Sequence, residues 1–414
     1  MEIAEQKKQL PLPLIVLMML SAGLAYFFSN FHRFSLGVVS SILVTELQLD
    51  PAMLGLLGSG FFYSYGLMQT PCGILSDKVS PRLILFLSCL LAAVSTLWFS
   101  VAGGFAGLFV SRTLTGFAVA FVYLSAMAVI REWFDEKIFG TMNGILIAMG
   151  QLGSVCTSVP LLLAINQWGW RGTFRALAYV SMVLCIVVWF SVRSRGRSKK
   201  SGLKPPVWQS TKKTFKNPGF WSVIFFSLVV SGPRLSFQGL WGARFYGSVL
   251  EKGDEKAVLL MTISIGCIVG AMLLGWMADR FGHFRVLAGT GFIMALIWFF
   301  YAFIDSSTHR IVPYVLNFIL GVLGVGGYTV SISSVLFFSS GSNGGFLAGI
   351  NGSSGFLGSA VFTQLVGIFF SVSGFEERTG YRIMFVVFGV LCIVITLWLM
   401  LSNRNAKKNV SFQN

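Results

Sequence analysis

The chain has 414 residues, of which 55% are hydrophobic and only 11% are charged, and its formal net charge is +16. Soluble domains carry about 25% charged residues, so a surface this poor in charge would aggregate in water unless lipid covered it. The composition therefore argues against an ordinary soluble domain. It also argues against nucleic acid as a partner, because no soluble domain is left to present the basic excess.

Apolar segments long enough to cross a bilayer recur from one end of the sequence to the other. Their spacing predicts an all-α membrane protein with twelve transmembrane helices. The predicted helices of the first half are 12–44, 52–73, 82–102, 105–130, 139–165 and 172–192, and those of the second half are 219–248, 256–276, 285–304, 311–338, 344–372 and 381–402.

Lysine and arginine are distributed unevenly among the predicted loops. Most of the 31 fall on the side that carries both termini, and segment 193–218 is especially basic. Because positively charged loops stay in the cytoplasm, we predict a multi-pass protein of a bacterial-type inner membrane with both termini cytoplasmic. We interpret 193–218 as a solvated cytoplasmic linker, and binding to lipid headgroups is the alternative.

Several motifs recur roughly 200 positions apart, which indicates a tandem duplication. The clearest set is Gly140, Gly144 and Gly150, which reappear as Gly345, Gly349 and Gly355. We predict two pseudo-symmetric six-helix halves, 1–192 and 219–414, joined by the linker 193–218. Parallel repeats of this kind frame a solute site near the middle of the bilayer.

The turn after the second predicted helix reads Gly73-Ile74-Leu75-Ser76-Asp77-Lys78, and a degenerate copy follows the eighth. Together with Arg112-x-x-x-Gly116, this turn resembles the signatures of the major facilitator superfamily, although Ser80-Pro81 departs from the usual pattern. The resemblance covers nearly the whole chain and implies alternating access by rocking of the two halves. The cytoplasmic gate that it implies consists of Gly73, Asp77, Lys78, Arg82, Asp279 and Arg280.

Three arginines, Arg33, Arg112 and Arg234, fall inside predicted helices. A buried arginine at the middle of a membrane costs at least about 2.5–3.5 kcal/mol, so it must face a wet cavity or a partner. Arg33 and Arg234 occupy near-equivalent positions on the first and seventh helices, which line the central cavity in the superfamily. Two facing guanidinium groups can together hold a carboxylate or phosphate. The alternative for Arg33 is snorkelling to the outer interface.

Polar and aromatic side chains extend this candidate site. Tyr26 and Asn30 share a helix face with Arg33, and Gln238 and Trp241 share one with Arg234, because their spacings are three and four residues. The further substrate-binding candidates are Tyr63, Tyr65, Gln69, Gln151, Tyr328 and Gln364. The alternative for each of them is a hydrogen bond between helices.

Energy coupling has few candidates, because every acidic residue falls in a tail, a loop or a helix end. His32 is the only histidine inside a predicted helix and titrates in a suitable range, so we consider it and Arg112 as coupling residues. A structural hydrogen bond is the alternative for His32. Proton symport and obligate exchange both stay open.

These features predict a monomeric secondary active transporter for a small organic anion or carboxylate-bearing solute. The solute would be an organic acid, an amino acid or a phosphorylated metabolite, and the arrangement resembles the organic-anion and organophosphate branches of the superfamily. The alternative is a multidrug or metabolite efflux carrier. An enzyme is disfavoured, because the sequence offers no embedded nucleophile with its base and no cluster of metal ligands. We expect no cofactor.

Overall fold

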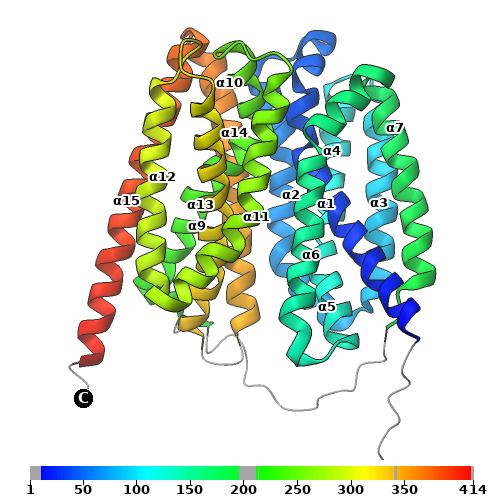
Figure 1. Ribbon diagram of the computed structural model, residues 1–414, viewed down its shortest axis with the longest axis vertical. Helices are drawn as coiled ribbons and strands as arrows, with labels where there is room; N and C mark the ends of the chain where they lie inside the picture. Colours follow the sequence, from blue (N-terminus) through cyan, green and yellow to red (C-terminus); the bar gives the residue numbers. More distant parts are fainter. Residues whose placement is uncertain (1–10, 195–210, 213, 340–342, 412–414) are drawn as a thin grey trace, which may run out of the picture.

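The computed structural model describes residues 11–194, 211–212, 214–339 and 343–411. Every regular element in these ranges is a helix (Figure 1). The side chains at positions 12, 73, 74, 76–78, 136, 137 and 404–411 are outside the description.

The first half of the chain folds into seven labelled helices. They are α1 (Leu12–Leu47), α2 (Pro51–Lys78), α3 (Pro81–Val101), α4 (Phe105–Val119), α5 (Val122–Trp133), α6 (Glu136–Cys156) and α7 (Val159–Ser191). The starts of α2 and α3 follow from local sequence. Asp50 and Ser80 accept hydrogen bonds from the backbone N–H groups of Met53 and Leu83, and each precedes a proline at the first helical position.

The structure corrects two of the predicted helix boundaries. The predicted helix 105–130 is interrupted between α4 and α5, and the predicted helix 139–165 is interrupted after Cys156. The second part of that prediction belongs to α7, whose backbone turns at Gly169, where φ is 67°. Glycine accommodates this left-handed conformation without a steric penalty. Hydropathy does not detect such breaks, because apolar residues continue through them.

The second half folds into helices that mirror the first. They are α9 (Pro218–Ser236), η1 (Phe237–Trp241), α10 (Gly242–Ser248), α11 (Glu255–Phe281), α12 (His283–Phe303), α13 (Ile311–Val335), η2 (Leu336–Phe338), α14 (Gly344–Val372) and α15 (Glu377–Ser411). α9, η1 and α10 are continuous, and η1 is a π-helical turn. A π turn holds more residues than an α turn, so it rotates the side chains that follow it.

Eleven of the described helical segments are long and apolar enough to cross a membrane. The twelfth is α2, in which glycine, serine, tyrosine and glutamine lower the hydropathy. Three of the eleven segments combine neighbouring elements: α4 with α5, α9 with η1 and α10, and α13 with η2. The twelve-helix prediction is therefore confirmed, and the chain is a multi-pass membrane protein.

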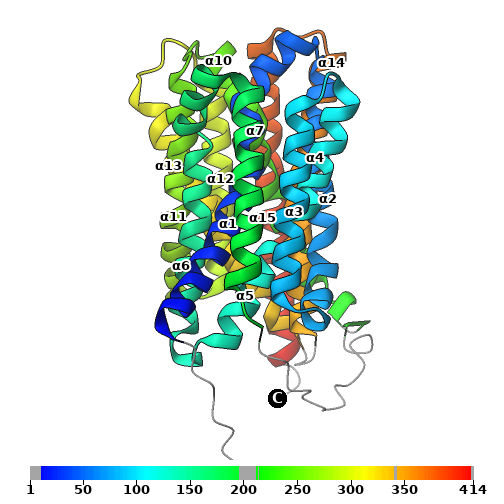
Figure 2. The ribbon, with the colours of Figure 1, turned by 90° about the vertical axis from the view of Figure 1, so that its right-hand side faces the viewer.

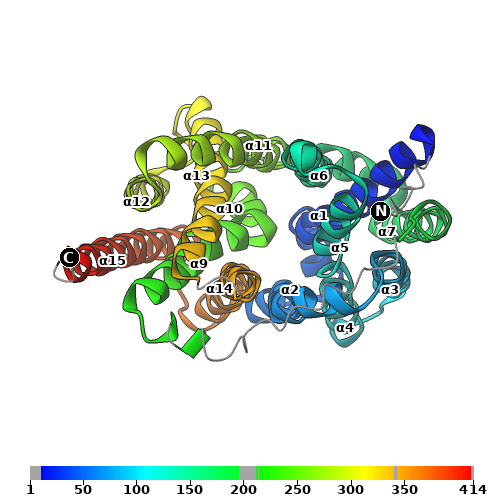
Figure 3. The same cartoon turned by 90° about the horizontal axis from the view of Figure 1, so that it is seen from below.

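The helices form two groups around a central axis. Seen from below, α1 to α7 lie on one side and α9 to α15 on the other, with α2 beside α14 and α6 beside α11 (Figure 3). Figure 2 views the first group, with α6, α7 and α3 toward the reader. α1 begins and α15 ends at the same end of the bundle, which we call the terminal end (Figure 1). The opposite end is the far end.

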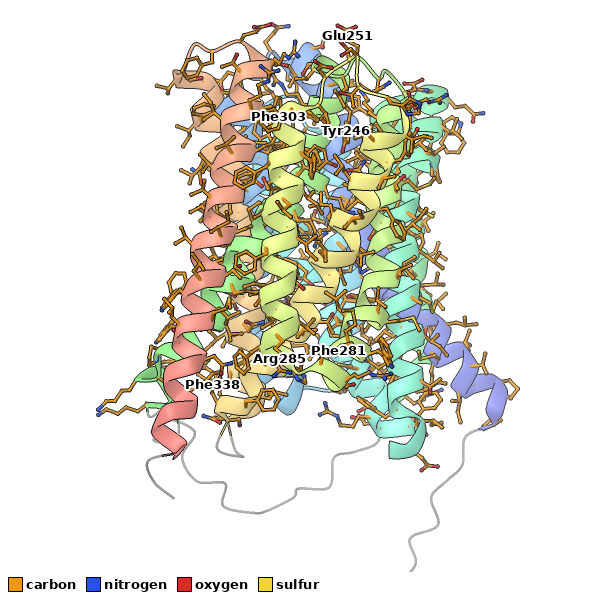
Figure 4. All side chains as sticks on the ribbon, turned by 60° about the vertical axis from the view of Figure 1, so that its left-hand side comes forward. Tyr246, Glu251, Phe281, Arg285, Phe303 and Phe338 are labelled. Atoms are coloured by element: carbon orange, nitrogen blue, oxygen red, sulfur yellow. The ribbon has the colours of Figure 1, made fainter. Side chains whose placement is uncertain are left out.

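Apolar side chains cover the outside of the bundle. Phe303 of α12 is 76% exposed and Met272 of α11 is 77% exposed, which suits contact with lipid rather than water. Figure 4 shows Glu251 near the far end, and Phe281, Arg285 and Phe338 near the terminal end. Charged groups thus gather at the two ends of the bundle.

The two halves meet closely at the far end. A Cβ atom added to Gly37 of α1 would lie 3.1 Å from the carbonyl oxygen of Gly239 in η1, so the two backbones nearly touch. The backbone N–H of Ala52 donates to Ser371 Oγ at 3.0 Å. Apolar residues of both halves also join there in one buried cluster. Small residues permit this close helix approach, so the far end is sealed in this conformation.

Contacts between α2 and α14 continue toward the terminal end. Tyr63 donates a hydrogen bond to Gln364 at 2.8 Å, and the Thr70 and Ser353 hydroxyl groups pair at 3.1 Å. By contrast, ion pairs at the far end act within each half: Glu46 with Arg171, Glu377 with Arg244, Glu255 with Arg310, and Asp305 with Arg378.

Candidate solute-binding site

Arg33 lies where the two halves meet, halfway along α1. Its guanidinium carbon Cζ lies 4.7 Å from the ring centre of Tyr65 on α2 and 4.9 Å from the ring centre of Phe356 on α14. Its Nη1 donates to Asn30 Oδ1 at 2.9 Å. The residue is 8% exposed. Aromatic faces attract a guanidinium electrostatically, so the three side chains hold Arg33 at the interface between the halves.

Arg234 of α9 is held on the other side by residues of η1, α11 and α13. Its Nη1 donates to Gln238 Oε1 at 2.6 Å, and Gln238 Nε2 in turn donates to Ser264 Oγ at 3.0 Å. The side chain crosses the backbone of α13 at Gly324, where an added Cβ would lie 1.8 Å from Arg234 Cδ. Only glycine leaves room for the arginine at this position. Arg234 is 4% exposed.

Arg112 has a different environment inside the first half. Its Nη1 donates to the carbonyl oxygen of His32 at 2.8 Å, and its Cζ lies 4.9 Å from the ring centre of Phe61. Asn317, its counterpart in the repeat, donates to the carbonyl oxygen of Leu259 at 2.9 Å. Both residues therefore tie a helix to a neighbouring backbone within their own half. The coupling role of Arg112 stays a prediction.

None of these three arginines forms an ion pair with a described carboxylate. The ion pairs of Glu46, Glu255, Asp305 and Glu377 all lie at the far end. The Nε atoms of Arg33 and Arg234 are buried and make no hydrogen bond. Geometry links the two arginines: the ring of Phe356 beside Arg33 lies 6.2 Å from the ring of Tyr328, which is one turn along α13 from Gly324, where Arg234 crosses that helix. Burying a charge without a counter-ion is strongly unfavourable, so this pair of arginines is the candidate solute site.

Four tyrosines gather around Arg33. The rings of Tyr26 on α1 and Tyr123 on α5 have centres 5.0 Å apart. Tyr328 on α13 packs edge to face against Phe356, with ring centres 6.2 Å apart. The Tyr328 hydroxyl and Gln69 Oε1 lie 3.4 and 3.6 Å from the position of a Cβ added to Gly352 on α14. The site is therefore built from both halves.

Three residues of this region were absent from the sequence prediction: Tyr123, Asn143 and Phe356. Tyr123 donates to Asn143 Oδ1 at 3.3 Å. The internal repeat held a signal for Tyr123, because the interval that pairs Arg112 with Asn317 also pairs Tyr123 with Tyr328. Neither Asn143 nor Phe356 had such a signal.

Some predicted residues lie apart from the arginines. Tyr63 and Gln364 pair with each other across the halves, and Gln151 accepts a hydrogen bond from Ser154 at 3.4 Å. The indole N–H of Trp241 donates to the carbonyl oxygen of Thr363 at 3.1 Å. The prediction that Arg234 and Trp241 share one helix face assumed an uninterrupted α-helix. In the structure the π turn η1 begins after Arg234 and ends at Trp241.

His32 points away from the cluster around Arg33. It faces a cavity of about 10 Å³ inside the first half, together with Ser88 and Ser181. His32 Nε2 and Ser181 Oγ are buried and make no hydrogen bond. The cavity is about large enough for one water molecule. The coupling role of His32 stays a prediction.

The predicted gate is described only in part. Gly73, Asp77 and Lys78 lie outside the residues whose side chains the structure describes. Arg82 stacks on Trp189 of α7, with its Cζ 4.2 Å from the ring centre. Asp279 and Arg280 are exposed near the end of α11. Ser80 and Pro81, the departure from the usual signature, begin α3. The gating role stays a prediction.

A twelve-helix bundle in two groups, with charged side chains buried where the groups meet, defines a solute carrier of the membrane. The sequence model described as Major Facilitator Superfamily matches residues 22–363 and 257–414. The chain belongs to the major facilitator superfamily and is a secondary transporter for a small molecule.

Relatives in this family are distant. The chain is 20% identical over 315 residues to "Probable hexose phosphate transport protein" of Chlamydia trachomatis, covering 67% of this chain and 68% of that protein. It is 23% identical over 391 residues to "Gentisate transporter" of Corynebacterium glutamicum, covering 90% and 85%. The fold also resembles a bacterial homologue of the human lysosomal transporter Spinster, with a TM-score of 0.74, 19% identity, and coverage of 95% and 98%.

Proposed function

We propose that this protein carries a small organic anion across a bacterial inner membrane by alternating access. The anion binds between Arg33 and Arg234. The observation that carries the proposal is the pair of buried guanidinium groups, both positively charged, which form no ion pair with a carboxylate in the described part of the chain. An anion between them satisfies both charges at once.

The chemistry of the two arginines supports this choice. Each uses Nη1 to bind an amide side chain of its own helix, Asn30 or Gln238. This contact orients the guanidinium and leaves other N–H donors for a carboxylate or phosphate. Charge-assisted hydrogen bonds of this kind are the strong ones.

The relatives support an anionic solute as well. A hexose phosphate and gentisate, the solutes in the names of the two relatives, are both anions at neutral pH. The two solutes differ in size and in their anionic group. They therefore support a negatively charged solute for this protein but do not indicate which one.

The transport cycle follows from how the halves, 1–192 and 219–414, contact each other. The described ion pairs act within a half, whereas the far-end contacts between halves use backbone and small side chains. Each half can therefore rotate as a unit. We place the terminal end, including linker 193–218, in the cytoplasm on the basis of the basic loops. Proton coupling through His32 and exchange of two anions are both compatible with this cycle.

A carrier that exports apolar compounds is the second candidate. The aromatic rings around Arg33 favour it, because they would receive an apolar solute. Buried arginines without carboxylates disfavour a cationic one. An organic anion would pack against the rings and neutralise the arginines, so it is the better candidate.

The test is uptake into proteoliposomes of labelled organic acids, amino acids, sugar phosphates and cationic dyes. We expect uptake of an anion by the wild type, and a loss of about tenfold or more in Arg33→Gln and Arg234→Gln, since a hydrogen bond to a charged group contributes about 1.5–3 kcal/mol. Arg382→Gln is the matched control, because Arg382 is an exposed arginine on α15. Uptake restricted to neutral or cationic compounds would refute the proposal.

A further inference from the structure

The surroundings of the two arginines are rich in aromatic rings. Tyr26, Tyr123 and Tyr328 are each partly exposed; Tyr26 and Tyr328 lie in the interior of their helices, and Tyr123 lies at the start of α5. They come from α1, α5 and α13, so both halves contribute. Tyr65 and Phe356 pack behind them against Arg33, and the ring centres of these two residues are 4.4 Å apart.

The amide oxygens nearest the two arginines already accept hydrogen bonds from the protein. Asn30 is engaged on both sides of its amide, because its Oδ1 accepts from Arg33 and its Nδ2 donates to the carbonyl oxygen of Tyr26 at 3.1 Å. Gln238 is likewise occupied by Arg234 and Ser264. Asn143 Oδ1 accepts from Tyr123. No described carboxylate forms an ion pair there.

These rings and occupied acceptors favour some classes of anion over others. Each hydroxyl of a sugar acid or sugar phosphate needs an acceptor for its proton, and a buried donor left unpaired costs about 1–3 kcal/mol. An aromatic carboxylate needs acceptors for few or no protons. Its charged group binds guanidinium donors, and its ring packs on tyrosine rings in the offset or edge-to-face geometries that aromatic pairs prefer.

We infer that the solute is an aromatic carboxylate, bound through its carboxylate to Arg33 and Arg234 and through its ring to Tyr26, Tyr123 and Tyr328. This inference rests on the proposed function and restricts it to one class of organic anion. Tyr328 is the ring contributed by the second half, so the solute contacts both halves and is enclosed when they rock.

The experiment measures initial uptake by the full chain in proteoliposomes. The three labelled probes, at equal concentration, are 4-hydroxybenzoate, gluconate and glucose 6-phosphate. We expect the uptake of 4-hydroxybenzoate to exceed that of the other two by about tenfold, because gluconate and glucose 6-phosphate each carry several more hydroxyl groups than its single phenol, and one unpaired hydroxyl already accounts for that ratio.

Two substitutions at Tyr328 separate the ring from its hydroxyl. Tyr328→Phe keeps the ring and should retain uptake within about twofold, whereas Tyr328→Leu should lower it about tenfold, since aromatic pairs contribute about 0.5–1.5 kcal/mol beyond their buried area. Tyr179→Leu, at a tyrosine that is 60% exposed on α7, is the control. Size-exclusion profiles check that every variant is folded.

The outcomes separate the inference from the proposed function. If gluconate or glucose 6-phosphate enters faster than 4-hydroxybenzoate, the aromatic class is wrong and an anion carrier remains. If none of the three anions enters, the aromatic class is overturned, and the wider panel of organic acids, amino acids and sugar phosphates then decides on the anion carrier. Equal losses in Tyr328→Phe and Tyr328→Leu would also overturn the ring contact.

Discussion

At the scale of single residues, Arg234 owes its position to the absence of a side chain on the neighbouring helix. The arginine crosses α13 at Gly324, and nothing larger than hydrogen fits between them. Gly324 is therefore a positioning residue: it does not contact the solute, but it determines where the guanidinium lies.

Gly324→Ala should reproduce the effect of losing the arginine. The added Cβ would overlap Arg234 Cδ, so the side chain must leave its present position. We expect anion uptake to fall about tenfold or more, comparable to Arg234→Gln. Gly289→Ala on α12, where an added Cβ meets nothing within 4 Å, is the matched control. Normal uptake by Gly324→Ala would show that the position of Arg234 is not critical.

Asn317 illustrates a buried polar residue with a structural role. It accepts hydrogen bonds from the hydroxyl groups of Tyr246 and Tyr301 and donates to the carbonyl oxygen of Leu259. Hydrogen bonds between membrane helices contribute about 0.6 kcal/mol on average. We expect Asn317→Ala to lower the melting temperature while the affinity for the anion stays within about twofold. A large loss of affinity with unchanged melting would contradict this role.

At the scale of helices, the sequence predicted the number of spans better than their internal geometry. The apolar runs and the repeat located twelve helices, because membrane thickness sets their length. The breaks near residues 120 and 157 and the π turn η1 were missed, since apolar composition continues through all three. The candidate site follows the same pattern: Arg33 and Arg234 emerged from the repeat, whereas Phe356 depends on how α14 packs on α2.

The contact of α2 with α14 at the far end should act as a movable seal. Cysteines placed at Ala52 and Ser371 would lie next to each other in this conformation, because Ser371 Oγ accepts a hydrogen bond from the backbone N–H of Ala52 at 3.0 Å. Oxidation of the double variant should stop uptake, and reduction should restore it, because alternating access requires the seal to open. Each single cysteine variant is a control. Full uptake by the cross-linked protein would contradict the opening of this contact.

At the scale of the whole molecule, the bundle consists of two groups of helices that share a buried site. The contacts within each group differ in kind from the contacts between the groups. Ion pairs hold each half at the far end, and small residues and aromatic contacts join the halves. This division suits rocking, because it keeps each half rigid while the contact between them changes.

The placement of the molecule in the membrane is testable as a whole. Basic loops predict that the terminal end, with both termini, faces the cytoplasm. A C-terminal fluorescent-protein fusion should therefore fluoresce, and a C-terminal alkaline phosphatase fusion should be inactive. The reverse result would invert the orientation without changing the site.

The central claim is that Arg33 and Arg234 together bind an anion. The most direct measurement is the melting temperature of the purified protein with and without each member of a panel of organic anions, since a ligand that binds the folded state raises it. We predict that at least one anion raises the melting temperature of the wild type and of Arg382→Gln, but not of Arg33→Gln or Arg234→Gln. Equal stabilisation of all four proteins by that anion would contradict the claim.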